Sequence, residues 1–125
     1  MQPDHFQERL EIVRKRFASS LESKINDTYA ELPRLSEGDR KAFDAVSNAY
    51  RRIHGICGVG RTVGFPETGR AAKDVEDVLV AAYRGQRGLA AGEIARLEKT
   101  LGALATAAHA ELRSASTPST AQHGG

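Results

Sequence analysis

The sequence predicts an all-α protein, folded as an antiparallel up-down four-helix bundle. Four stretches carry apolar residues at spacings of three and four, which is the period of a helix with one buried face. Alternating runs of β-branched residues, which would indicate strands, do not occur, whereas alanine and leucine are plentiful. The connections between the four stretches are short, and helices joined by short loops pack as antiparallel neighbours.

The first helix is expected from Asp4 to Leu32. Asp4 and Gln7 have the spacing of a capping box at its start. Six apolar residues then form one stripe: Phe6, Leu10, Val13, Phe17, Leu21 and Ile25. Pro33 is expected to end the helix, because the residue before a proline is pushed out of helical geometry. The helix is long for such a bundle, so its first turns are expected to extend past the partner helices or to bend over one end.

The second helix is expected to begin after Asp39 as N-cap and to run to about Thr62, with Gly64 just past its end. Its inner face is marked by Phe43, Val46, Tyr50, Ile53, Cys57 and Gly60. The third helix is expected to begin at Pro66, since proline is favoured in a first turn, and to end near Arg84. Its stripe consists of Ala72, Val75, Leu79 and Ala82.

The fourth helix is expected from about Ala90 to Leu112. Its apolar positions are Ile94, Leu97, Leu101, Leu104 and Ala108. Residues 1–113 would then form one domain. Residues 114–125 are rich in serine, threonine, proline and glycine and show no periodicity, so they are expected to be a disordered tail.

The composition argues against several function classes. A net charge of +2 is too weak to indicate binding to nucleic acid. No stretch approaches the roughly 18 apolar residues of a membrane span. The charged N-terminal segment has no apolar core of a signal peptide, so a cytoplasmic protein without a membrane partner is expected. Cys57 is the only cysteine, which rules out an internal disulfide.

One histidine of the second helix stands among glycines. His54 lies at the edge of the apolar arc, and Gly58, one turn further on, leaves open backbone on the same face. Arg51 and Arg61 lie near that face on either side. A neutral imidazole nitrogen is a nucleophile near physiological pH, and arginine side chains could neutralise a phosphoryl group carried there. The alternative interpretation is an ordinary boundary histidine beside glycines that allow close helix contact.

The stretch that begins at His54 resembles a known signature. Its matching residues are His54, Ile56, Gly58, Gly60, Val63 and Gly64, followed by Phe65 and Pro66. They resemble the motif of histidine-containing phosphotransfer (HPt) domains, which lies on the second long helix of a four-helix bundle. Cys57 departs from this pattern, because the family usually has lysine there, and Val59 is bulkier than the usual small residue.

The resemblance implies a phosphorelay carrier without kinase activity of its own. His54 would accept a phosphoryl group from the aspartate of a response-regulator receiver domain and pass it to another receiver, and a hybrid histidine kinase is a further expected partner. No cofactor is implied, since the Mg²⁺ needed for transfer belongs to the receiver, and a monomer is expected. With Cys57 in place of lysine, Arg61 is the best candidate to neutralise the phosphate, followed by Arg51. Arg70 is a candidate for the rim of the docking surface.

Two other functions compete with this interpretation. The first is a non-catalytic helical adaptor that binds receiver domains without phosphotransfer. The second is a redox role for Cys57 or a metal site with His54 and Cys57, although two ligands fall short of the four that zinc prefers. The charged residues of the third helix are expected to form a solvated face: Lys73, Asp74, Glu76 and Asp77.

Overall fold

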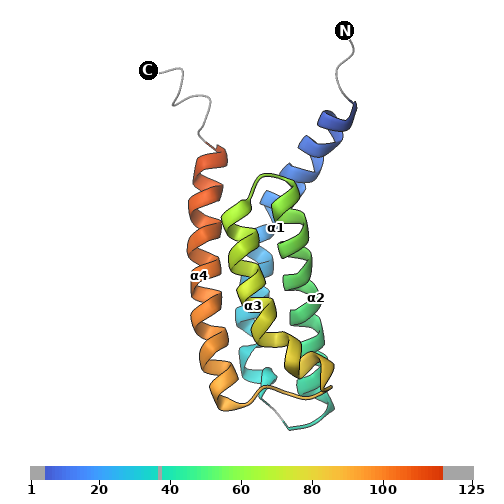
Figure 1. Cartoon of the computed structure of the whole chain (residues 1–125), viewed down its shortest axis with the longest axis vertical. Coiled ribbons are helices and arrows are strands. Elements are labelled where there is room, and N and C mark those ends of the chain that lie inside the picture. Colours follow the sequence, from blue (N-terminus) through green and yellow to red (C-terminus); the bar gives the residue numbers. More distant parts are fainter. Residues whose placement is uncertain (1–4, 37, 117–125) are drawn as a thin grey trace.

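The structure, a computed structural model, describes residues 5–36 and 38–116, and these residues form four helices and no strand (Figure 1). The helices are α1 (His5–Leu35), α2 (Arg40–Thr62), α3 (Pro66–Arg84) and α4 (Ala91–Ser116). Each helix packs against the next one in the chain, and α4 returns to pack against α1. The predicted all-α, antiparallel up-down bundle is therefore confirmed.

The core runs along the centre of the bundle and receives side chains from every helix. Leu21 of α1, Ile53 of α2, Leu79 of α3 and Leu101 of α4 are all fully buried. These residues come from the stripes that the sequence predicts, and burial of each such side chain stabilises the fold by roughly 1.5–3 kcal/mol. None of the helices in the described part of the chain is long and apolar enough to cross a bilayer.

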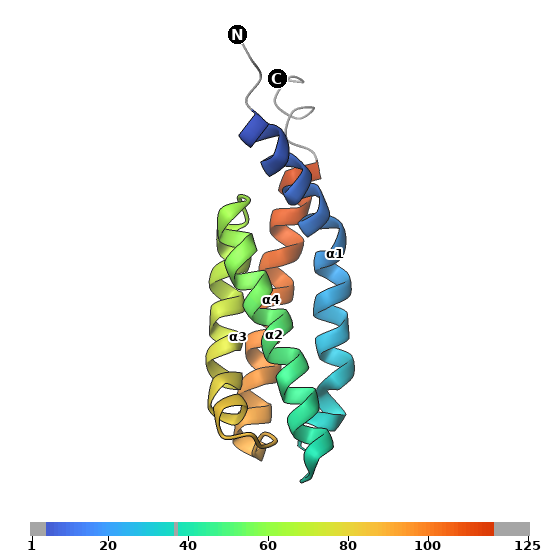
Figure 2. The ribbon, with the colours of Figure 1, turned by 90° about the vertical axis from the view of Figure 1, so that its right-hand side faces the viewer.

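The first turns of α1 extend beyond the ends of α2 and α3 (Figures 1 and 2). Phe17 is buried as expected, but Val13 is 42% exposed and Phe6 is 66% exposed. The apolar stripe is continuous in sequence, yet it is fully covered only from Phe17 on; before that, Leu10 is partly buried against the core. The expected capping residue Asp4 lies outside the described residues.

Pro33 does not end α1, and that prediction was wrong. The helix continues to Leu35 with the proline in its last turn. Leu35 is fully buried, and its carbonyl accepts a hydrogen bond from the backbone N–H of Leu89 at 2.8 Å. Proline has helical φ and removes only one N–H donor, so the burial of Leu35 outweighs the local cost.

Both ends of α2 follow their sequence signals. The Asp39 carboxylate accepts a hydrogen bond from the Lys41 N–H at 3.0 Å and caps α2 as predicted. At the other end Gly64 has φ of +93°, and the Phe65 N–H donates to the Gly60 carbonyl at 2.8 Å. Such a left-handed residue just past a helix end suits glycine, which has no Cβ to clash.

The start of α3 is capped from a distant helix. Phe65 occupies the N-cap position but makes no side-chain cap. Instead the Glu111 carboxylate of α4 accepts hydrogen bonds from the Glu67 N–H at 3.0 Å, the Thr68 N–H at 2.8 Å and the Thr68 hydroxyl at 2.7 Å. A carboxylate at this place satisfies free N–H groups and complements the helix dipole.

We expect Glu111→Ala to lower the free energy of unfolding by about 1–2 kcal/mol, the usual cost of a lost helix cap. The loss follows because Thr68 is buried and would keep two donors without a partner. Urea unfolding followed by circular dichroism measures it. Glu98→Ala, an exposed position of the same helix, is the control. Equal stability of the Glu111 and Glu98 variants would contradict the cap.

The last helix runs further than predicted. It begins at Ala91, and residues 114–116, which were expected in the tail, are helical. Residues 117–125 lie outside the described part of the chain. Glu93 accepts the Ala90 N–H at 2.8 Å and pairs with Arg87 at 2.8 Å. The hydrogen bond from Arg87, followed by the one from Ala90, lowers the pKa of Glu93 to about 2. This carboxylate therefore stays ionised and holds the loop before α4.

Candidate functional site

His54 stands on the surface of α2, beside α3. Its side chain is 67% exposed, so the ring is open to solvent. One edge of the ring is nevertheless fixed, because Nδ1 lies 2.7 Å from Oε2 of Glu76 on α3. The Glu76 side chain is only 10% exposed. An exposed imidazole is thus tied to a nearly buried carboxylate of the neighbouring helix.

As long as this contact is made, it determines which ring nitrogen is available. An ionised carboxylate only accepts hydrogen bonds, so Nδ1 carries the proton and donates it to Glu76. In the neutral ring the other nitrogen, Nε2, then holds an unshared electron pair. The arrangement is that of an oriented nucleophile, with one nitrogen held by the protein and the other available to a partner.

Glu76 is the site residue that the sequence analysis missed. It was expected on a solvated face, together with three charged neighbours, and that expectation was wrong for Glu76. Asp74 is exposed, and Lys73 pairs with Asp77 at 2.9 Å on the surface, as expected. A signal was present, because Ala72 and Leu79 lie at i−4 and i+3 from Glu76 and belong to the buried stripe.

A row of aromatic rings leads to His54 along the contact between α2 and α3. Tyr50, one turn before His54, is nearly parallel to the imidazole, with ring centroids 5.9 Å apart and an angle of 15°. Tyr83 of α3 stacks on Tyr50 at 4.1 Å and 13°, and Phe43 lies beside Tyr83 at 6.5 Å. Burial raises the pKa of the Tyr50 phenol, and the charge and hydrogen bonding of Glu76 raise it further.

The glycines around His54 fall into two groups. A Cβ added at Gly55 or Gly58 would meet no atom within 4 Å, so the surface beside the histidine is open, as predicted for Gly58. At Gly60 the added atom would lie 3.3 Å from the Phe17 ring. At Gly69 of α3 it would lie 2.9 Å from Cγ of Arg61 and 3.3 Å from the Cys57 carbonyl. Gly60 and Gly69 therefore serve the close packing of α2 on α3 and α1.

The three predicted arginines do not hydrogen-bond to His54. Arg51 donates to the Ser47 hydroxyl, one turn further from the histidine. Arg70 is held by Glu67 of its own helix at 2.6 Å. The Arg61 side chain makes no hydrogen bond or ion pair with any residue in the ranges 5–36 and 38–116, and its stem covers Gly69. Its guanidinium group is the one that is free to approach a ligand at the histidine.

Lys73 is a further cation near the site. It lies on the strip of α3 between Gly69, which contacts α2 at Cys57, and Glu76, which contacts His54. The hydrogen bond that Lys73 donates to Asp77 and then the charge of Asp77 raise the pKa of Lys73, and Glu76 adds a smaller increase. Lys73 was expected on the solvated face of the third helix. It is exposed there, at the border of the site.

The geometry gives little support to the metal-site and redox alternatives. Cys57 is buried in the core, in agreement with its predicted place on the inner face of α2. Across the described ranges no group of three or more histidine, cysteine, aspartate or glutamate side chains could hold a metal ion.

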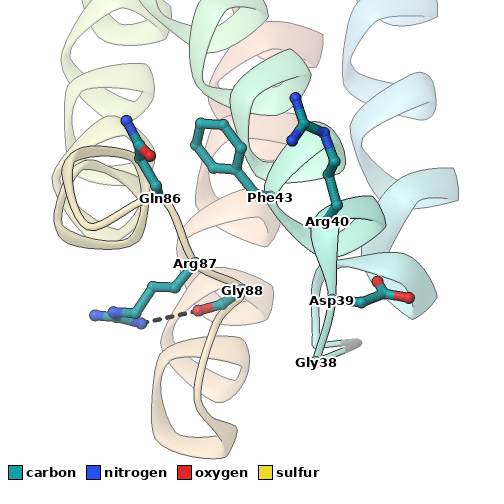
Figure 3. Close-up of a pocket in the computed structure, with 7 residues that line it drawn as sticks. All are labelled: Gly38, Asp39, Arg40, Phe43, Gln86, Arg87 and Gly88. Atoms are coloured by element: carbon teal, nitrogen blue, oxygen red, sulfur yellow. Dashed lines mark hydrogen bonds between the residues drawn. The ribbon is translucent and has the colours of Figure 1, made fainter.

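A pocket at the other end of the bundle lies away from this site. It has a volume of about 580 Å³ and is lined by Gly38, Asp39, Arg40, Phe43, Gln86, Arg87 and Gly88. Phe43 stands between the Arg40 and Gln86 side chains, and Arg87 donates to the Gly88 carbonyl at 2.9 Å (Figure 3). From position 43 to position 54, α2 rises about 16 Å, so His54 belongs to a convex helix surface at a distance from this pocket.

Comparison with family models, with curated proteins and with solved structures finds no match to this chain.

Proposed function

We propose that the protein is a phosphorelay carrier, in which His54 accepts a phosphoryl group from the aspartyl phosphate of a receiver domain and passes it to a second receiver. The observation that carries this proposal is the contact between the exposed His54 ring and the nearly buried Glu76 carboxylate, 2.7 Å from Nδ1. It is supported by the likeness of the segment from His54 to Gly64 to the HPt signature. Such a relay would operate in the cytoplasm.

The chemistry needs one nucleophile and no pocket. The electron pair of Nε2 attacks phosphorus, a P–N bond forms, and the P–O bond to the receiver's aspartate breaks, so that the carboxylate leaves with the bonding pair. The proton on Nδ1 stays in place, and the phosphorylated ring carries a positive charge. Glu76 stabilises that charge across the short hydrogen bond. Return transfer to the next aspartate reverses the same step.

The surface around His54 suits a large partner. Gly55 and Gly58 leave the α2 backbone uncovered beside the ring, so a receiver domain can bring its own phosphorylation site close to Nε2. Arg61 and Lys73 border the site and can offset the phosphate charge, while Arg70 lies further out, paired with Glu67. In-line phosphoryl transfer depends mainly on such positioning and charge neutralisation.

The test is label transfer from phosphorylated receiver domains to the purified protein. We expect phosphate that is labile in acid and stable in base to appear on the parent protein, and to be absent from His54→Gln. His109→Gln is the matched control, because His109 is also exposed and pairs with a carboxylate, Glu22, at 3.2 Å. Undiminished labelling of His54→Gln would contradict the assignment.

The same experiment separates the carrier from the adaptor. Receiver domains that bind the parent protein without labelling it would indicate a non-catalytic adaptor. Binding is measured by titration of the unphosphorylated receiver in parallel with the transfer assay.

A further inference from the structure

The contact with Glu76 does not by itself fix the His54 ring. One hydrogen bond restrains one atom, Nδ1, and leaves the ring plane free to rotate about the line to Oε2. An exposed side chain on a helix also has several rotamers available. A second restraint on the ring plane is needed to present Nε2 in one direction.

Tyr50 provides that restraint. Its ring is within 15° of parallel to the imidazole and lies one helical turn away, at i−4, where side chains of a helix meet. Tyr50 is itself held, because Tyr83 of α3 stacks on it at 4.1 Å. The Tyr50 ring is therefore anchored by α3 and lies nearly parallel to the exposed His54 ring.

Tyr50 also acts on the second member of the pair. Glu76 is nearly buried, and a buried carboxylate is costly unless several donors satisfy it. His54 supplies one donor, at 2.7 Å. Besides burial, the charge and hydrogen bonding of Glu76 raise the pKa of the Tyr50 phenol, which places that phenol beside the same carboxylate. A phenol beside the carboxylate can act as its second donor and restrain its direction toward Nδ1.

We propose that Tyr50 is a positioning residue for phosphoryl transfer: its phenol holds Glu76 and its ring sets the plane of His54, so that Nε2 carries the free electron pair and faces the partner. This inference rests on the proposed function. It assigns the selection of the tautomer to three residues, Tyr50, Glu76 and His54. In water, a histidine side chain prefers the opposite tautomer, with the proton on Nε2, so the arrangement has a direct spectroscopic signature.

The test combines histidine tautomer populations with transfer rates. In protein labelled with ¹⁵N at histidine, the ring nitrogens are recorded by NMR at about pH 8.5, where histidine is ordinarily neutral. We expect His54 of the parent protein to be mainly protonated on Nδ1. In Tyr50→Leu the population should move toward protonation on Nε2, and transfer from a phosphorylated receiver should slow roughly fivefold through lost orientation. Tyr50→Phe, which keeps the ring, should lie between the two.

The control is Tyr29→Leu, since Tyr29 lies on the exposed side of α1. A folded Tyr50→Leu protein with the parent's tautomer populations overturns the inference, even when transfer is slower, because a slower rate alone indicates a docking contact. If Tyr50→Leu fails to fold, Tyr50→Phe decides: it retains the packing and loses the phenol, and unchanged tautomers overturn the inference. If the parent protein is never labelled by a receiver, the proposed function fails, and the tautomer populations still decide the role of Tyr50.

Discussion

Replacing Glu76 by alanine is expected to slow phosphoryl transfer to His54 about tenfold. The phosphorylated ring is positively charged, and the variant removes the carboxylate that lies 2.7 Å from Nδ1. A hydrogen bond to a charged group contributes roughly 1.5–3 kcal/mol, and solvent around the exposed ring reduces this to about 1.4 kcal/mol, or one factor of ten. Glu76→Gln should slow the transfer less, because its amide oxygen still accepts a hydrogen bond from Nδ1–H.

Single-turnover transfer from a phosphorylated receiver measures this effect. Asp74→Asn is the matched control, since Asp74 is a carboxylate of the same helix that is exposed to solvent. Circular dichroism must show that the Glu76 variants remain folded. A Glu76→Ala protein that is labelled as fast as Asp74→Asn would show that the carboxylate is structural.

Replacing Gly69 by leucine is expected to lower the free energy of unfolding by roughly 3 kcal/mol, at the upper end of the range for overpacked cores. Even a single Cβ at this position would lie 2.9 Å from the Arg61 side chain and 3.3 Å from the Cys57 carbonyl. The carbonyl belongs to the α2 backbone and cannot move aside without separating the two helices. Thermal unfolding should show a midpoint lower by about 10 °C.

Gly58→Leu is the paired control for this prediction. A Cβ added at Gly58 would meet no atom within 4 Å, and leucine is the better helix former by up to about 1 kcal/mol. Its midpoint should be equal to the parent's or higher. Equal loss of stability in both variants would contradict the division of the glycines into an open group and a packed group.

Local signals in the sequence were sufficient to predict most of the fold. Asp39 and Pro66 begin their helices as predicted, because capping and proline geometry act within a few residues. The prediction that Pro33 ends the first helix was wrong, because α1 is kept helical by the burial of Leu35 and by its hydrogen bond with Leu89. Leu89 lies far along the chain, where a local rule does not reach. A local rule fails where a distant contact outweighs it.

The candidate site also has one part that could be predicted from the sequence and one part that could not. His54 and the open glycine beside it could be identified from spacing alone. Glu76 and Tyr83 could not be joined to them, because their contacts cross from α3 to α2 and depend on how the two helices are aligned. Arg51 and Arg61 were placed near the histidine by their position on α2, but side-chain partners such as Ser47 decide where a guanidinium group points.

The cap that Glu111 places on α3 links distant parts of the chain during folding. It joins α4 to the first turn of a helix 43 residues earlier, where Thr68 has no partner of its own for its N–H. An isolated hairpin of α2 and α3 would therefore fray at the turn that carries Gly64. We therefore expect a chain cut before α4 to hold its histidine on a helix pair whose α3 start lacks its cap.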